Sequence, residues 1–199
     1  MVSLLLRYGA NLDHISALSW TPLFYCWPKL EATHISMANF LTTLANADDF
    51  DVNIIDKWGW TVIDRAAAYG TADDIETLIN LGASVNTCAL PLRWSAIFHA
   101  TYYGNFETFL TLVPHYSPII IQETDARGWT LLHIAASAGH VQIVRHLLSL
   151  GTDPYSLSKP YMSHMPKELF GRRCTPEEVA AAQSARRREQ FLEAVKEVS

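Results

Sequence analysis

The sequence has few cysteines and none of the residue patterns typical of a catalytic or metal site. Its 199 residues include three widely spaced cysteines, Cys26, Cys88 and Cys174, and this odd number indicates free thiols in a reducing compartment. It contains no Cys-x-x-Cys, His-Glu-x-x-His, Gly-x-Ser-x-Gly or glycine-rich phosphate loop. The eight histidines do not have the spacing of a ligand set. We therefore expect no cofactor, no bound metal and no enzymatic activity.

Long apolar runs and an excess of positive charge are missing as well. The apolar start Leu4–Leu6 is too short for a secretory signal, and no stretch reaches membrane-spanning length. The net charge of −5 and the pI near 5.9 argue against a nucleic-acid binder, which needs a basic field. The one basic cluster, Arg186–Arg188, is followed by Glu189, so we interpret it as a solvated helix face in preference to a nuclear address. We expect a cytoplasmic protein, with the nucleus as the alternative.

A repeated tryptophan is the main feature that the sequence does contain. Trp20, Trp60, Trp94 and Trp129 each precede a threonine or serine, at intervals of 40, 34 and 35 residues. A period in this range is typical of stacked supersecondary units. The core of such an array belongs to the repeat, and function belongs to the residues that vary on the exposed face.

The segment after Trp129 predicts a pair of short helices. Thr130 can cap a helix whose apolar residues Leu132, Ala135 and Ala136 fall at i, i+3 and i+4. Gly139 can adopt the left-handed conformation that ends this helix. A second apolar stripe follows in 141–148. Because such a pair cannot bury its apolar stripe alone, we expect the pairs to stack into one continuous core.

This segment resembles the ankyrin repeat. Thr130-Leu131-Leu132-His133-Ile134-Ala135 stands where the family carries T-P-L-H-x-A. A second copy runs over 56–86, and a third, over 92–113, keeps Ala100 and Gly104 but loses the usual ending. The resemblance covers 56–153, and the chain is similar to the ankyrin-repeat segments of large fungal multidomain proteins. It implies an all-α fold, an ankyrin-repeat solenoid of stacked helix-turn-helix units whose loops form β-turn fingers.

We expect residues 1–199 to form a single array. Its predicted parts are a partial first repeat at 1–15, an irregular repeat with an insertion at 16–55, a repeat at 56–89, a degenerate repeat at 90–123, a repeat at 124–157 and C-terminal capping helices at 158–199. Pro28 ends a helix early, and the insertion after it is interpreted as a surface loop in preference to a binding loop. Thr175-Pro176-Glu177-Glu178 predicts the start of a capping helix. The partial first repeat leaves an apolar edge that could self-associate, or marks a fragment of a longer protein.

The resemblance also implies a binding surface. In ankyrin arrays the residues just before the threonine and the pair before the turn point into a concave groove. Carried over to this sequence, they give an aromatic and cationic set: Lys57, Trp58, Trp60, Tyr69, Arg93, Trp94, Tyr102, Tyr103, Arg127 and Trp129. Because Trp, Tyr and Arg dominate binding hot spots, we expect this set to bind a partner protein or peptide that carries apolar and acidic groups. Trp94→Ala or Tyr103→Ala should then weaken binding and leave the helices intact.

Three alternatives remain open at this stage. The tryptophans can pack inside the array and stiffen it. The groove can instead bind a small molecule and act on it, with Asp64 or His99 as the acid–base group. The chain can also be a scaffold or sensor segment of a larger multidomain protein. We interpret His133 and the Asp64–Arg65 pair as braces for the loops, and we expect no nucleophile from Cys26 and His34.

Overall fold

The computed structural model describes residues 16–17, 19–27, 37–45, 51–161 and 163–198. The predicted partial repeat at 1–15, its apolar edge, the insertion after Pro28 and His34 lie outside these ranges. The described chain divides into two compact units, one formed by residues up to Ala100 with Glu107–His115, the other by Thr101–Phe106 with Tyr116 onwards.

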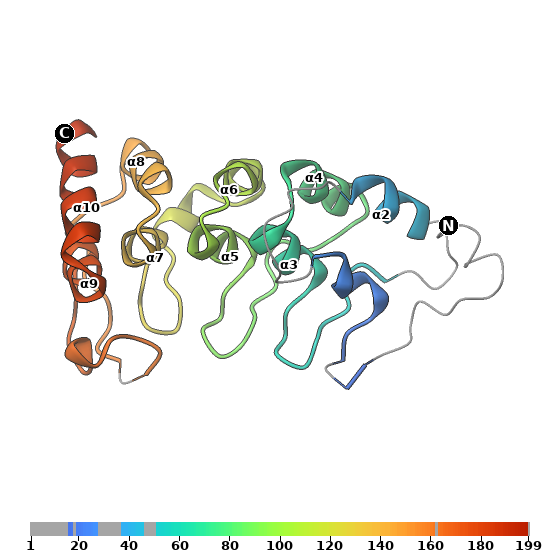
Figure 1. Ribbon diagram of the computed structural model, residues 1–199, viewed down its shortest axis with the longest axis horizontal. Coiled ribbons are helices and arrows are strands. Elements are labelled where there is room, and N and C mark those ends of the chain that lie inside the picture. The colour runs from blue at the N-terminus through green and yellow to red at the C-terminus, as the bar shows by residue number, and fades with distance from the viewer. Residues whose placement is uncertain (1–15, 18, 28–36, 46–50, 162, 199) are drawn as a thin grey trace. The chain divides into compact units, whose positions relative to one another are not determined.

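The described residues form nine α-helices, four short 3-10 helices and no strand. In chain order they are η1 (Pro22–Cys26), α2 (Ala38–Leu44), α3 (Val62–Tyr69), α4 (Ala72–Asn80), α5 (Ala96–Tyr103), α6 (Phe106–Leu112), η2 (Val113–His115), η3 (Pro118–Ile121), α7 (Leu131–Ala138), α8 (Val141–Ser149), η4 (Lys167–Leu169), α9 (Pro176–Gln183) and α10 (Ala185–Val198), most of them labelled in Figure 1. The helices follow one another in pairs, which confirms the predicted all-α repeat fold. The repeat boundaries assigned from the sequence stay a prediction.

In the first unit α4 packs against α2 and α3, and η1 packs against α3. Ile63, Ile75, Leu78 and Phe109 are fully buried in its core. The Thr108 hydroxyl on α6 donates to the Ala67 carbonyl on α3 across 3.1 Å, which fixes these two helices in register. The segment after Thr21 was predicted to start a helix that Pro28 ends early, and η1 is a single short 3-10 helix.

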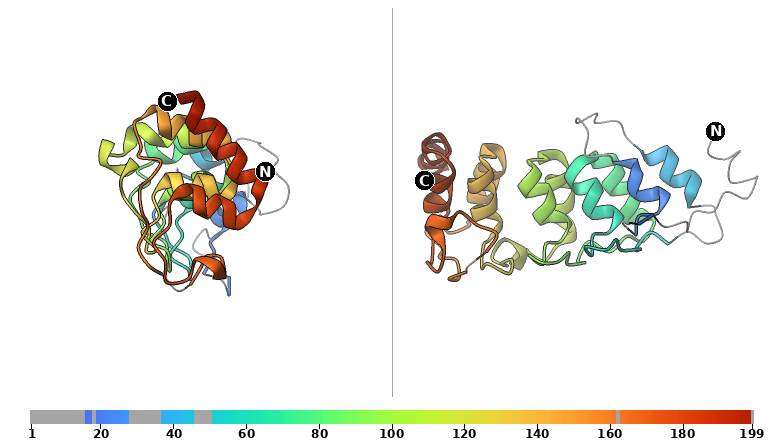
Figure 2. Two further views of the ribbon diagram at one scale, coloured as in Figure 1. Left: turned by 90° about the vertical axis from the view of Figure 1, so that its left-hand side faces the viewer. Right: turned by 60° about the horizontal axis from the view of Figure 1, so that its bottom comes forward.

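In the second unit α7 packs against α8 and α9, and α10 packs against α8 and α9 (Figure 2). Gly139 ends α7 with a φ of 81°, as predicted. Thr175 caps α9: its side chain accepts from Glu178 N, and the Glu178 carboxylate accepts from Thr175 N. The predicted capping box at the start of this helix is therefore confirmed.

Each of the four repeated tryptophans follows a residue with positive φ. The values are 57° at Ser19, 79° at Gly59, 60° at Arg93 and 74° at Gly128. A left-handed residue reverses the chain so that the tryptophan and the next helix cap turn back toward the core. Glycine adopts this conformation freely, whereas a residue with a Cβ is strained in it by roughly 1–2 kcal/mol. Ser19 and Arg93 are therefore held in an unfavourable conformation.

Candidate functional site

Two turns of the first unit carry the exposed end of the predicted surface. We call them the 55–61 turn and the 89–94 turn, and each is closed by one antiparallel bridge, Ile55 with Thr61 and Ala89 with Trp94. The buried Asp56 organises the first turn, because its carboxylate accepts from Trp58 N at 2.8 Å and from Trp60 N at 2.9 Å. Leu90 N donates to the Trp58 carbonyl at 3.2 Å and joins the two turns.

Three large apolar side chains stand in water on these turns. Ile55 is 57% exposed, Trp58 46% and Leu90 66%. The Lys57 ammonium lies 4.3 Å from the centre of the Trp58 ring, and Arg93 is exposed on the second turn. Both exposed charges on the two turns are positive, since Asp56 is buried within its hydrogen bonds.

Trp20 and Trp60 pack on side chains of the following repeat. The Arg65 guanidinium lies 4.2 Å from the Trp20 ring, and the Trp20 indole N–H donates to Asp56 at 3.1 Å. The Trp60 ring lies 3.9 Å from the His99 ring. Arg65 and His99 occupy the same position, four residues after the helix cap at Thr61 or Ser95. These two tryptophans therefore join successive repeats of the first unit, which is the internal-packing interpretation.

The other predicted contact residues differ in exposure. Tyr102 is 45% exposed, Tyr69 and Tyr103 are half-buried, and Trp94 is only 8% exposed. Truncating a buried tryptophan removes core packing and costs roughly 3–5 kcal/mol. Trp94→Ala therefore tests folding more than binding, contrary to our expectation from the sequence that it would leave the helices intact.

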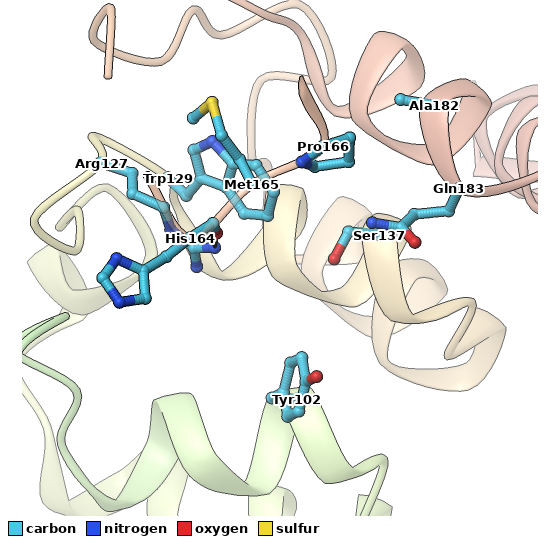
Figure 3. A pocket seen from close by; sticks show the side chains of 9 residues that line it. All are labelled: Tyr102, Arg127, Trp129, Ser137, His164, Met165, Pro166, Ala182 and Gln183. Carbon is cyan, nitrogen blue, oxygen red and sulfur yellow. Dashed lines mark hydrogen bonds between the residues drawn. The ribbon is translucent and has the colours of Figure 1, made fainter. Parts of the chain in front are cut away.

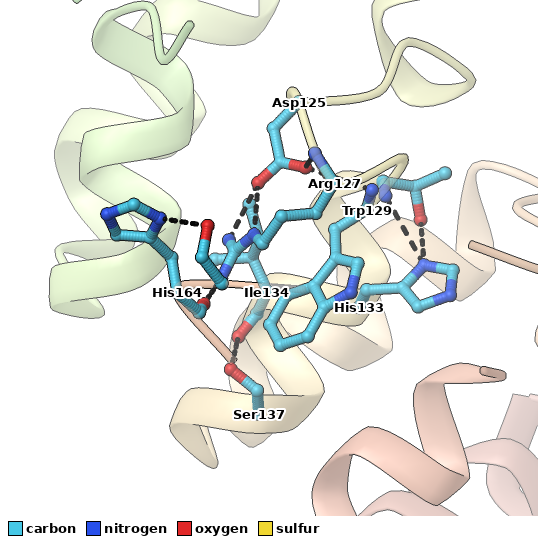
Figure 4. A network of polar contacts seen from close by, with 9 residues as sticks. Asp125, Arg127, Trp129, His133, Ile134, Ser137 and His164 are labelled. Carbon is cyan, nitrogen blue, oxygen red and sulfur yellow. Dashed lines mark hydrogen bonds and ion pairs between the residues drawn. The ribbon is translucent and has the colours of Figure 1, made fainter. Parts of the chain in front are cut away.

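In the second unit the predicted pair Arg127 and Trp129 is buried, at 5% and 2% exposed (Figure 4). Arg127 forms a 2.6 Å ion pair with Asp125, donates to the His164 carbonyl at 2.6 Å and lies 3.8 Å above the Trp129 ring. Asp125 repeats the role of Asp56, since it accepts from Arg127 N and Trp129 N. These contacts engage the Arg127 guanidinium inside the unit, so it is not the exposed charge that the sequence suggested.

Asp64 is a buried helix brace. Its Oδ2 atom accepts from the Thr61 N–H at 2.8 Å and from the Thr61 hydroxyl at 2.9 Å, while its Oδ1 atom has no hydrogen-bond partner among the described residues. Burial raises the pKa of Asp64 to about 7, against the lowering effect of these two hydrogen bonds. Arg65 donates instead to the Trp27 carbonyl at 2.8 Å. The structure therefore agrees with the bracing interpretation of both residues.

His99 is enclosed by aromatic rings, and neither of its ring nitrogens has a hydrogen-bond partner among the described residues. Trp60 lies on it at 3.9 Å, and Trp94 meets it edge-on at 5.4 Å. Burial lowers the pKa of His99 to about 3, so the ring is neutral at physiological pH. A neutral imidazole shut in by two indoles is poorly placed to exchange protons with a substrate.

His133 is a structural residue, as expected. Its Nδ1 atom contacts the Thr130 hydroxyl at 2.9 Å, and its Nε2 N–H donates to the Cys174 carbonyl at 2.9 Å. Burial lowers its pKa to about 4. Burial also raises the pKa of the Cys26 thiol to about 12, so Cys26 is not a thiolate nucleophile.

The described ranges contain no group of three or more His, Cys, Asp or Glu side chains that could hold a metal ion. None of the helices within them has both the length and the apolar character needed to cross a bilayer. The compartment predicted from the sequence stays a prediction.

Two neighbouring cavities open on the second unit. The larger, about 440 Å³, is lined by Tyr102, Arg127, Trp129, Ser137, His164, Met165, Pro166, Ala182 and Gln183, and Figure 3 shows Tyr102 across from the other eight. The smaller, about 220 Å³, shares Tyr102, Ser137 and Gln183 and adds Ala138, His140 and Arg187. Neither Asp64 nor His99 lines these cavities, so the small-molecule hypothesis gains no catalytic group from them.

Sequence reasoning missed Ile55 and Leu90 on the turns and Met165, Gln183 and Arg187 at the cavities. The positions before the tryptophans pointed to the turns that carry Ile55 and Leu90, but the sequence did not show that these two side chains are exposed. No local pattern marks the cavity residues, because they come from loops and helices far apart in the sequence.

The comparisons with known proteins agree with this architecture. A family model described as ankyrin repeats, in three copies, matches residues 66–157. The chain is 41% identical over 63 residues to protein phosphatase 1 regulatory subunit 27 of Homo sapiens and of Mus musculus, which is 32% of this chain and 40% of that protein. It is 33% identical over 95 residues to ankyrin repeat and SOCS box protein 3 of Homo sapiens, 47% of this chain and 18% of that protein.

The chain thus spans 40% and 18% of the lengths of these relatives. They are mammalian proteins, so they lend no support to the suggested resemblance to large fungal proteins. Helix pairs at the tryptophan period, left-handed turns before each tryptophan and the family match all point to one architecture. Ankyrin repeats are protein-interaction modules, and the family model for them matches residues 66–157 of this chain.

Proposed function

We propose that this chain is a non-catalytic binding module whose first unit recognises a partner protein through the 55–61 and 89–94 turns. The carrying observation is the exposure of Ile55, Trp58 and Leu90 beside two exposed cations. Apolar side chains gathered on rigid turns and rimmed by charge are typical of a protein-binding surface. The family match and the names of the relatives, one of them a phosphatase regulatory subunit, support protein binding as the function.

The charges on the turns favour an acidic and apolar partner segment. Lys57 stands beside Trp58, and Arg93 lies on the second turn, while the chain as a whole carries a net charge of −5. Two exposed cations on an otherwise acidic protein attract an acidic ligand to this place. Trp58 and Leu90 provide the apolar area that such a segment would cover.

Arg93 supplies a second argument for function at the same surface. Its φ of 60° is a conformation that glycine adopts at the equivalent Gly59 and Gly128. An arginine there costs roughly 1–2 kcal/mol of backbone strain. Strain of this kind concentrates at functional sites, so we attribute the retention of an arginine to its exposed guanidinium.

The remaining residues of the predicted set have two roles in this proposal. Tyr69 belongs to the contact surface of the first unit, and the 45% exposed Tyr102 with Tyr103 to that of the second. The less exposed side chains hold the turns in place; they are the rings of Trp60, Trp94 and Trp129 and the guanidinium of Arg127.

Arg93→Gly and Trp58→Ala test the proposal. Proteins captured from an extract of the native cells by the wild-type chain are identified by mass spectrometry, and the affinity of each is measured with purified protein. Both variants should bind the partner at least about tenfold more weakly, which corresponds to roughly 1.4 kcal/mol. Arg93→Gly should keep its unfolding free energy within about 1 kcal/mol of the wild type, because relief of strain offsets the entropy of the added glycine.

Tyr155→Ala is the matched control, since Tyr155 is an aromatic residue of the other unit that is 71% exposed. It should leave the affinity unchanged. Equal binding of the partner by Trp58→Ala, Arg93→Gly and the wild type would contradict the proposal. Loss of binding in all three variants would place the contact outside the two turns.

A further inference from the structure

The two cavities of the second unit form a polar recess that contains positive charge. They share Tyr102, Ser137 and Gln183, so the two cavities are adjacent. Arg127, paired with Asp125, lines the larger cavity, Arg187 lines the smaller one, and none of the described residues lining either cavity is acidic. A recess with this lining is electrostatically suited to an anion.

Arg187 is the permanent charge in the smaller cavity. It lies on α10, and its guanidinium donates to the Ser137 carbonyl near the end of α7 while its side chain rests 3.2 Å from the Cβ position of Gly139. Arginine has five N–H donors, and the described residues provide no acceptor to its guanidinium other than the Ser137 carbonyl. Donors therefore remain for a ligand.

His140 occupies the corresponding place one repeat earlier. Its Nε2 N–H donates to the Tyr102 carbonyl at 2.8 Å, and its ring fills the space next to Gly104. Burial, reinforced by the nearby Arg187 charge, lowers the pKa of His140. The His140 imidazole thus covers Gly104, and the Arg187 side chain covers the equivalent Gly139 in the last repeat.

The charge of Arg187 is not neutralised by a carboxylate in the described part of the chain. Its neighbour Arg188 pairs with Glu177 at 2.7 Å, and Arg145 pairs with Glu197 at 2.5 Å. Arg187 forms no such ion pair there, although it is only half-exposed and faces a cavity. The carbonyl end of α7 stabilises it in part.

The larger cavity supplies apolar walls next to this charge. Trp129, Met165 and Pro166 lie on one side and Tyr102 on the other (Figure 3). The Trp129 indole Nε1 is buried, and no described residue offers it a hydrogen-bond acceptor. A ligand that combines an acidic group with a bulky apolar group fits this pair of cavities better than a free anion does, because a free anion leaves the apolar walls uncovered.

We propose that the two cavities together bind a peptide segment of a partner, with a carboxylate paired to Arg187 and Gln183 and an adjacent apolar side chain in the larger cavity. The proposal rests on the proposed protein-binding function and names a second contact on the second unit. The acidic and apolar chemistry of this ligand is the same as that expected at the turns of the first unit.

The test uses two short probes that differ in one charge: acetyl-leucyl-glutamyl-leucine amide and its glutaminyl analogue. Isotope-labelled full chain is titrated with each, and the indole N–H signal of Trp129 is followed by NMR. We expect the acidic probe to shift this signal and to bind roughly tenfold more tightly than the neutral one, the effect of one charge-assisted hydrogen bond.

Gln183→Glu is the key variant, because it keeps the size of the side chain and every described contact of Arg187 while placing a competing carboxylate in the recess. It should abolish the preference for the acidic probe. Gln142→Glu makes the same charge change at an exposed position of α8 that lines neither cavity, and it should preserve the preference. Arg187→Met should also abolish it.

Equal binding of the two probes by the wild type, or an unchanged preference in Gln183→Glu, would overturn the proposal. Either result would leave the turns of the first unit unaffected, since Trp58→Ala and Arg93→Gly are judged against the partner itself. Conversely, the partner could bind Trp58→Ala and Arg93→Gly as tightly as the wild type while the acidic probe still depends on Arg187. That combination would support the recess proposal and contradict the proposal for the turns.

Discussion

Replacing Asp64 with asparagine should remove a pH-dependent cost of folding. The Asp64 carboxyl is fully buried and has a folded-state pKa of about 7, against 3.8 for the ordinary side chain. The folded chain therefore holds a proton between these two pH values that the unfolded chain releases. Stability gained from Asp64 is fully present below pH 3.8 and is lost as the pH rises to about 7.

The size of this effect follows from the shift of about three pKa units. At 1.36 kcal/mol per unit, ionisation of Asp64 in the folded state costs on the order of 4 kcal/mol at pH above 7, of which roughly 2–3 kcal/mol appears between pH 5 and pH 7. His99 and His133 act in the opposite sense, because burial lowers their pKa values to about 3 and about 4. Only the difference between wild type and Asp64→Asn isolates the carboxyl.

Urea unfolding followed by circular dichroism at pH 5, 6, 7 and 8 measures that difference. The asparagine leaves an amide group where Oδ1 has no partner, which costs roughly 1–3 kcal/mol at every pH. The test is therefore how the difference in unfolding free energy between variant and wild type changes with pH, and not its absolute value. The unfolding free energy of the variant should rise relative to that of the wild type by roughly 2–3 kcal/mol from pH 5 to pH 7. Glu76→Gln, which removes an exposed carboxylate on α4, is the control and should show no such slope. A flat difference for Asp64→Asn would refute the burial argument, as would an NMR titration of the wild-type Asp64 carboxyl carbon with a midpoint near 4.

Two further predictions concern His99 and Gly104. Wild-type stability should fall by about 2 kcal/mol between pH 6.5 and pH 5, because His99 takes up a proton when the chain unfolds. His99→Leu should not show this part of the loss. Acid-unfolding curves of the variant and the wild type that run parallel would contradict this. Gly104→Ala should destabilise the chain more than Gly82→Ala, since both glycines have positive φ but a Cβ at Gly104 would collide with the His140 ring and one at Gly82 would contact nothing. The backbone term alone is about 1–2 kcal/mol for each, so equal midpoints in thermal unfolding would rule out the collision.

The helices and their ends were predictable from the sequence because local chemistry determines them. Thr175 with Glu178 forms a capping box, and Gly139 adopts the left-handed conformation that stops α7. Arg93 precedes its tryptophan where Gly59 and Gly128 precede theirs in the sequence, and its φ of 60° is left-handed as theirs are.

The exposure of the tryptophans was not predictable, because it depends on contacts between repeats. Trp60 is half-buried on account of His99, a residue 39 positions later that the repeat pattern leaves variable. The recess of the second unit is equally non-local. It needs the 158–166 loop, which Lys159 N fastens to the Arg127 carbonyl at 3.2 Å, and Arg187 from the last helix.

The same turn geometry thus gives opposite exposure in the two units. Asp56 and Asp125 each accept from the backbone N–H groups two and four residues later. The residue two positions after the aspartate is Trp58 at 46% exposed in one turn and Arg127 at 5% in the other. The His164 carbonyl accepts from Arg127 and covers it, whereas the exposed Trp58 ring has the Lys57 ammonium 4.3 Å from its centre. The aspartate hydrogen bonds therefore fix where the side chain starts, and the segment that packs on the turn determines whether that side chain is buried or exposed.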